Sequence, residues 1–167
     1  MARVSALVFM TVGAIASSAN AWSIKTHVDN MTDKQMTYAV DTAMSSITNA
    51  YGMQYTPRLL LACPGPGNKL QMYLDLGETV VISGDIIRNI HPANIRFDKT
   101  KEFTWDVSAS SDGKGYYFNN PANLLKKGNE AKRMLFQFTA MPTSQEITVD
   151  FDISGATDVL NKMQCHR

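Results

Sequence analysis

Apolar and polar residues alternate with a period of two along most of this chain, and this pattern restricts the fold more than any other feature. In residues 69–76 every second residue is apolar, and these residues are Leu70, Met72, Leu74 and Leu76. Successive side chains of a β-strand point to opposite faces, so the pattern predicts a strand with one buried face. In residues 36–43 the alternation places Met36, Tyr38 and Val40 on one side, and Thr37, Ala39 and Asp41 on the other.

Similar runs, separated by turn signals such as Pro64-Gly65-Pro66-Gly67-Asn68, predict the remaining strands. Strands are expected within residues 22–28, 36–43, 58–63, 69–76, 78–83, 95–98, 103–107, 116–118, 132–140 and 145–153. Residues 45–57 show no period and are expected to form a long loop, where binding residues are often found. His91 precedes Pro92 in an expected loop and is interpreted as a surface residue. Residues 119–130 are expected to contain a single helical turn.

Only the end of the chain has helical spacing. Ser154 is a good N-cap, and the apolar residues that follow at helical intervals are Ala156, Val159, Leu160 and Met163. About eight to ten short strands and one C-terminal α-helix predict a mainly β fold, either a β-sandwich or an open barrel of short antiparallel strands. The 167 residues are enough for one domain of ordinary size.

The first residues resemble a signal peptide. Arg3 precedes the apolar residues 4–15, and Ala19-Asn20-Ala21 is a small-x-small cleavage pattern, with Ala14-Ile15-Ala16 as a weaker alternative. We therefore expect residues 1–21 to be the signal peptide and residues 22–167 to be a single β-rich domain. A membrane helix needs roughly 20 apolar residues, so no membrane insertion of the mature chain is expected. The expected location is outside the cytoplasm, in the periplasm or the extracellular space.

The two cysteines, Cys63 and Cys165, both lie in the expected mature chain. An even pair in an exported protein predicts a disulfide bond. Without Arg3 the mature chain has equal numbers of basic and acidic residues, because the whole sequence has 16 Lys+Arg and 15 Asp+Glu. This balance gives no electrostatic reason to expect nucleic-acid binding.

No sequence motif points to catalysis, to a cofactor or to a metal. The three histidines are dispersed, and no serine or cysteine stands in a local nucleophile signature. Asp150 and Asp152 share one face of an expected strand, where alternation of outward polar residues explains them. We therefore expect neither catalytic residues nor a cofactor or metal site, and a protein that is not an enzyme.

Several motifs occur in an order that resembles the VasI/TagO family of exported proteins associated with type VI secretion, which includes uncharacterised bacterial and phage relatives. They begin with Trp22 and an Asp-rich turn and continue with a Pro-x-Leu-x-x-x-Cys strand at residues 57–63. Further along are Arg96-Phe97-Asp98, Trp105, and the segment Phe151-Asp152-Ile153-Ser154-Gly155-Ala156 leading to Cys165. The resemblance implies a periplasmic, non-enzymatic accessory role.

A binding protein of the bacterial envelope is therefore the first hypothesis, with an envelope protein or a cell-wall component as its partner. The residues expected to contact that partner are Arg96, Asp98, Trp105, Tyr51 and Tyr55. An ordinary ion pair between neighbouring strands is the alternative explanation for Arg96 and Asp98. Two other functions stay open: a periplasmic lysozyme inhibitor, which residues 111–130 faintly resemble, and a cell-wall hydrolase whose site is formed by distant residues.

Overall fold

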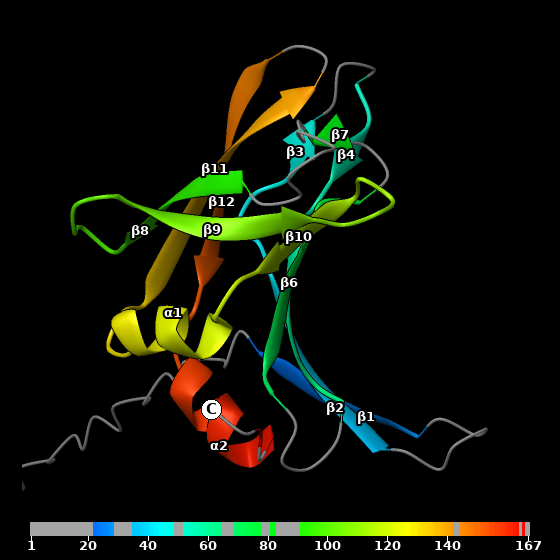
Figure 1. Cartoon of the computed structure of the whole chain (residues 1–167), viewed down its shortest axis with the longest axis vertical. Coiled ribbons are helices and arrows are strands. Elements are labelled where there is room, and N and C mark those ends of the chain that lie inside the picture. The colour runs from blue at the N-terminus through cyan, green and yellow to red at the C-terminus, as the bar shows by residue number, and fades with distance from the viewer. Residues whose placement is uncertain are drawn as a thin grey trace, which may run out of the picture.

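The computed structural model describes residues 22–28, 35–48, 52–64, 69–77, 81–82, 91–141, 144–163 and 165. The expected signal peptide and Tyr51 lie outside these residues. The described part is mainly antiparallel β structure, as the sequence predicts, and it has two helices where one C-terminal helix was expected (Figure 1). No helix within these residues is long and apolar enough to cross a bilayer.

The strands are β1 (Ser23–Val28), β2 (Gln35–Thr42), β3 (Ile47–Thr48), β4 (Gln54–Tyr55), β5 (Arg58–Cys63), β6 (Gln71–Asp75), β7 (Val81–Ile82), β8 (His91–Phe97), β9 (Phe103–Ala109), β10 (Gly115–Phe118), β11 (Arg133–Met141) and β12 (Gln145–Asp152). The helices are α1 (Pro121–Lys127) and α2 (Ala156–Met163). One large open sheet has the order β1-β2-β5-β6-β10-β9-β8-β11-β12, with β7 paired to β11, and β3 pairs with β4 in a separate hairpin.

The large sheet curls around one hydrophobic core. In Figure 1 the strands β8 and β9 cross in front of β11 and β12, while β2, β5 and β6 form the opposite wall. The curl brings the end of β2 to β12, where the amide of Met44 donates a hydrogen bond to the carbonyl of Asp150 at 2.8 Å. Alternate residues of these strands fill the interior, and the largest fully buried side chains include Phe136, Phe151 and Leu74.

The C-terminal helix closes one end of the core. The buried residues of α2 are Ala156, Val159, Leu160 and Met163, the set that the helical spacing predicts. The helix begins at Ala156, one residue later than expected, so Gly155 and not Ser154 directly precedes it. It ends at Met163, which lets the chain reach the disulfide between Cys165 and Cys63 of β5. The bond joins residues 102 positions apart and links the chain just after α2 to β5.

Four expectations about the elements are corrected. Residues 45–57 contain the hairpin β3–β4 and are not a continuous loop. His91 and Pro92 belong to β8, since pairing with β9 continues to His91 and Val107. The helical turn expected in residues 119–130 is a helix of seven residues, α1. Strand β8 ends at Phe97, so Asp98 lies outside it, with a positive φ of 45°.

Candidate functional site

A polar face runs across the four strands β9, β8, β11 and β12 on the side of the sheet away from the core. Asn94 of β8 lies opposite Thr104 of β9 and opposite Gln137 of β11. Gln137 in turn lies opposite Thr148 of β12. The Asn94 side-chain amide donates to Gln137 at 3.3 Å, and Gln137 donates to Glu146 at 3.4 Å. We call this outer surface of β9, β8, β11 and β12 the polar face. Two side-chain hydrogen bonds connect Asn94, Gln137 and Glu146 within it.

Arg96 occupies the neighbouring row of the polar face, opposite Leu135. Its side chain is exposed, while the adjacent Ile95 and Phe97 are buried in the core. Within the described residues the Arg96 guanidinium makes no hydrogen bond and no ion pair. Guanidinium presents several donors in a planar fork that matches a carboxylate or a phosphate. Arg96 is thus available to a partner that carries such a group.

A hollow of about 220 Å³ surrounds Arg96. The residues that line it are Asn94, Ile95, Arg96, Glu102, Leu135, Gln137 and Thr148. Amide, hydroxyl, guanidinium and carboxylate groups converge there around the side chain of Leu135. Such a mixed lining suits a contact that is mostly polar, because these groups can exchange water for hydrogen bonds of a partner.

Asp98 is committed to the protein's own backbone. Its carboxylate accepts hydrogen bonds from the amide of Arg133 at 2.8 Å and from the amide of Lys132 at 3.1 Å. The amide of Asp98 donates to the carbonyl of Arg133 at 3.0 Å. These contacts fix the entry of β11 beside the end of β8. Asp98 therefore stabilises a corner of the sheet and does not pair with Arg96.

Trp105 lies on the core side of β9, opposite Ala93. It is half-buried, and its indole N–H donates to the carbonyl of Asn119 at 2.6 Å. Its ring meets Phe103 edge-on at a centroid distance of 6.3 Å, and the Lys127 ammonium of α1 lies 3.8 Å from the Phe103 ring centre. Trp105 thus packs at the margin of the core, on the opposite side of the sheet from Arg96.

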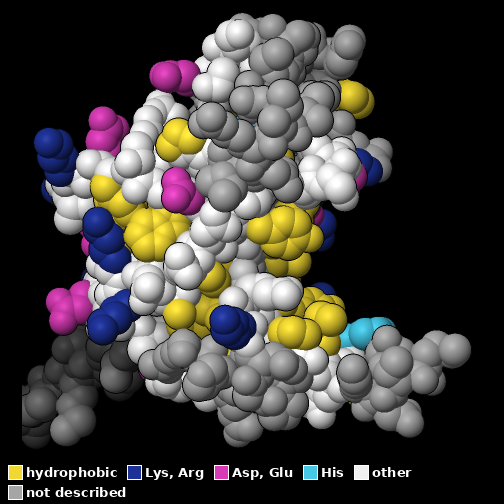
Figure 2. Space-filling model, viewed as in Figure 1, with side chains coloured by type: hydrophobic (Ala, Val, Ile, Leu, Met, Phe, Trp, Pro, Cys, Tyr) yellow, Lys and Arg dark blue, Asp and Glu magenta, His cyan; other side chains and the backbone are white. Residues whose placement is uncertain are grey.

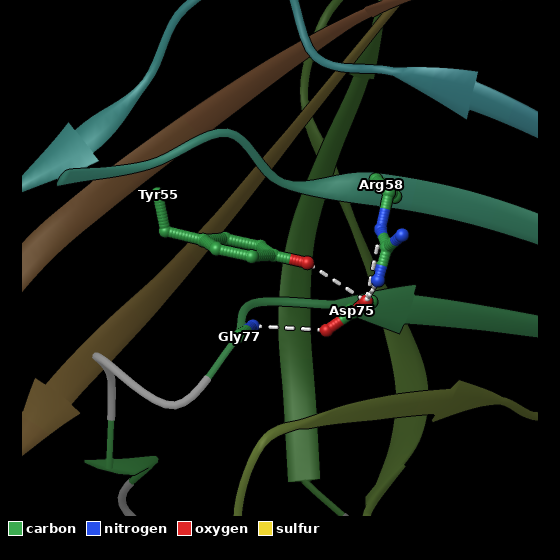
Figure 3. Close-up of polar contacts among 4 residues, drawn as sticks. All are labelled: Tyr55, Arg58, Asp75 and Gly77. Atoms are coloured by element: carbon green, nitrogen blue, oxygen red, sulfur yellow. Dashed lines mark hydrogen bonds and ion pairs between the residues drawn. The ribbon is translucent and has the colours of Figure 1, made fainter.

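Tyr55 belongs to a second cluster, at the ends of β4, β5 and β6 (Figure 3). Its hydroxyl donates to Asp75 Oδ2 at 2.8 Å, and the Arg58 guanidinium donates to the same oxygen, with its Nε at 3.1 Å. The amide of Gly77 donates to Asp75 Oδ1 at 2.9 Å. Figure 3 shows Tyr55 and Arg58 approaching the carboxylate from two sides. The Asp75 carboxylate therefore attaches the β3–β4 hairpin to the large sheet.

The pKa values in this second cluster follow from its hydrogen bonds. Burial alone would raise the pKa of Asp75, but the hydrogen bonds from Arg58, Gly77 and Tyr55 outweigh it and hold the pKa below its usual 3.8. Burial and the hydrogen bond to Asp75 raise the pKa of Tyr55. The tyrosine consequently remains a neutral donor to an ionised carboxylate over the ordinary pH range.

Asp41 is a buried carboxyl that the sequence pattern did not single out. It is the polar residue with 1% exposure in the core, and its Oδ2 has no hydrogen-bond partner within the described residues. Burial, with a smaller contribution from the nearby charge of Asp152, raises the pKa of Asp41 to about 7 against an opposing backbone hydrogen bond from Thr42. A carboxyl with such a pKa resembles a general acid, but at 1% exposure it is sealed from any substrate.

The structure therefore does not gather the residues expected to contact a partner into one site. Arg96 lies on the polar face, Trp105 lies on the core side of the same sheet, and Tyr55 attaches a hairpin near β6. The residues that sequence reasoning missed are Asn94, Gln137, Thr148, Arg58 and Asp75. Asn94 lay in the expected loop before residue 95, and the pairing of β8 with β11 joins positions about 40 residues apart, which one sequence does not reveal.

No protein-family model and no curated protein matches the chain. Among solved structures, invasion associated protein B from Bartonella henselae is similar, with a TM-score of 0.52 and 12% sequence identity. The match covers 86% of this chain and 91% of that protein. At this identity the similarity concerns the fold alone, and it includes nearly the whole length of both chains.

Proposed function

We propose that this protein is an exported, non-enzymatic binding protein of the bacterial envelope, with the periplasm as its location. The disulfide between Cys63 and Cys165 supports a location in an oxidising compartment, because such bonds are rare where thiols are kept reduced. The proposal agrees with the resemblance to the VasI/TagO family, which remains a hypothesis about this chain together with any link to type VI secretion.

The observation that carries the proposal is the exposed Arg96 in the hollow of the polar face, which has no hydrogen-bond or ion-pair partner among the described residues. The hollow has about 220 Å³, which is small for an enclosed ligand site. We infer that it receives a carboxylate-bearing side chain or terminus from a larger partner, and that the surrounding amides and hydroxyls provide the rim of that contact. The partner is an envelope protein or the peptide part of the cell wall, which carries such groups.

The buried position of Asp41 favours binding over hydrolysis, since the carboxyl with the raised pKa is enclosed by the core. Similarity of fold to an invasion associated protein leaves either role open, because one fold hosts many functions. The two alternatives, a lysozyme inhibitor and a cell-wall hydrolase, are therefore outcomes that the experiment must separate.

The experiment incubates the purified, disulfide-bonded protein with insoluble peptidoglycan and, separately, with lysozyme. The proposal predicts no release of soluble wall fragments and no protection of cells from lysozyme in a turbidity assay. In living cells, a chemical crosslinker should join the wild-type protein to envelope material, and Arg96→Glu should weaken that adduct at least about tenfold. Release of wall fragments would support the hydrolase, and lysozyme protection would support the inhibitor.

A further inference from the structure

The edge strand β1 carries a feature that the proposed function does not use. All six residues of β1 are exposed, and β2 is its one neighbour among the described strands. Pairing with β2 runs without interruption from Ser23 to Val28, so neither a bulge nor a proline blunts this edge. An unprotected edge offers a row of backbone N–H and C=O groups to another strand.

Exposed apolar side chains concentrate in the same hairpin. Three of the six large hydrophobic residues that are exposed in the described chain lie there: Ile24 at 38%, Val28 at 47% and Met36 at 40%. Figure 2 shows hydrophobic side chains at the surface over this lower right part of the molecule, beside a histidine. Figure 1 shows the hairpin extending away from the curled sheet, so the core does not cover its end.

The opposite edge differs in both respects. Strand β12 is bridged by the Met44–Asp150 hydrogen bond, and it carries Glu146, Asp150 and Asp152. Charged residues and covering segments are the usual means by which an edge avoids further pairing. Strand β1 carries one charged residue, Lys25, and no described strand other than β2 pairs with it, so β1 is the more open of the two edges.

We propose that β1 pairs antiparallel with β1 of a second copy, about a two-fold axis that passes through Thr26. The sequence of β1 is self-complementary about this residue, because Ile24 and Val28 lie two positions on either side of it. In this register Ile24 lies opposite Val28 of the second copy, twice, and the two concave faces continue on one side of the joint sheet. Identical patches that pair about a two-fold axis are the commonest basis of homodimers.

Other registers fit less well. An axis through Lys25 places the two Lys25 ammonium groups opposite each other and leaves Ile24 facing a threonine. A shift of one residue from the Thr26 axis places Ile24 opposite His27 and turns the concave face of one copy to the other side of the sheet. With the axis at Thr26, Lys25 lies opposite His27 of the second copy, on the face away from the apolar pairs.

The test measures the mass of the purified, disulfide-bonded protein by sedimentation at concentrations up to about 100 µM, the range of weak association. We expect a reversible dimer. The double variant Ile24→Lys/Val28→Lys places lysines opposite each other twice and should weaken association at least about tenfold, whereas Ile24→Lys/Val28→Glu places lysine opposite glutamate and should restore it. The restoring variant distinguishes a lost contact from a misfolded hairpin.

A cysteine at the axis gives the second readout. Thr26→Cys should form an intermolecular disulfide on mild oxidation, because the two introduced thiols would face each other across the axis. Lys25→Cys should not form such a bond, because the two introduced thiols would be offset from each other along the strands. A monomer at every concentration, or equal crosslinking at both positions, would overturn the proposal. The proposal would also be overturned if, in cells, the cysteine introduced at position 26 formed its disulfide with a different protein and not with a second copy. None of these results bears on Arg96, so the proposed function is tested separately.

Discussion

The amide of Met44, just after β2, donates a hydrogen bond to the carbonyl of Asp150 in β12 at 2.8 Å. This contact joins two parts of the chain that are separated by nearly the whole of the large sheet. Asp41 is buried close to the same seam, and the charge of Asp152 acts on it. The stability of the curled sheet should therefore depend on the protonation of Asp41.

The first prediction concerns pH. Asp41 has an ordinary pKa of 3.8 and a pKa of about 7 in the folded protein, so between these values the folded state holds one more proton than the unfolded state. The free energy of unfolding should fall as the pH rises through this window, by up to about 1.4 kcal/mol per pH unit. Above the window, Asp41 should cause no further change. Asp41→Asn cannot ionise and should lose this slope. Urea unfolding of both proteins from about pH 4.5 to 8 measures it.

The control for that series is Asp106→Asn, which alters an exposed carboxylate on β9. It should retain the wild-type pH dependence. An Asp41→Asn protein whose stability still falls across this window as steeply as the wild type would show that another group is responsible.

The second prediction uses two glycines with the same positive φ angle. Gly77 and Gly113 both have a φ of +69°, but a Cβ at Gly77 would lie 2.5 Å from the Tyr55 ring, whereas one at Gly113 would meet nothing within 4 Å. Gly113→Ala should cost about 1 kcal/mol from backbone strain alone. Gly77→Ala should cost about 2–4 kcal/mol, because it also displaces Tyr55 from Asp75. Chemical denaturation measures both.

In a Tyr55→Ala background the extra cost of Gly77→Ala should disappear, since the ring that clashes is gone. Equal costs for the two glycine substitutions in the wild-type background would contradict the attachment of the β3–β4 hairpin through Tyr55.

The third prediction concerns the disulfide. It closes a loop of 102 residues, and on the chain-entropy model its loss should destabilise the protein by about 4–5 kcal/mol. The variant Cys63→Ser/Cys165→Ser should show this loss in thermal unfolding. Adding a reductant should destabilise the wild type and leave the double variant unchanged; a reductant effect on the double variant would point to a cause other than this bond.

Much of the fold was predictable because the core depends on local alternation. Leu70, Met72, Leu74 and Leu76 are all buried, and so are the apolar residues of α2. The β2 strand shows the limit of that reasoning. Its larger apolar residues Met36, Tyr38 and Val40 face outward and remain partly exposed, and the core side carries Ala39 and Asp41. The pairing of Asp41 with Leu59 and of Ala39 with Leu61 in β5 decides this orientation. The alternation within β2 alone contains no information about its partner strand.

The candidate site was predictable only in part. Arg96 was singled out by its position between apolar residues, and the structure places it on the polar face. Most of the residues that line its hollow lie on other parts of the chain, among them Glu102, Leu135 and Thr148. The pairing of β8 with β11 and of β11 with β12 brings the last two beside Arg96. Trp105 was named because it follows Arg96 and Asp98 closely in the family-like order of motifs, but its indole N–H donates to the carbonyl of Asn119 within the protein.

The central claim is that a partner binds the polar face around Arg96, and site-specific photocrosslinking in living cells tests it most directly. A photoreactive residue replaces Thr104 or Thr148, which are exposed at the two ends of the row, or Lys162 on α2 as the control. The account predicts the same adduct from positions 104 and 148, no such adduct from position 162, and its loss in Arg96→Glu. Equal labelling from all three positions, or an adduct that Arg96→Glu leaves unchanged, would contradict it.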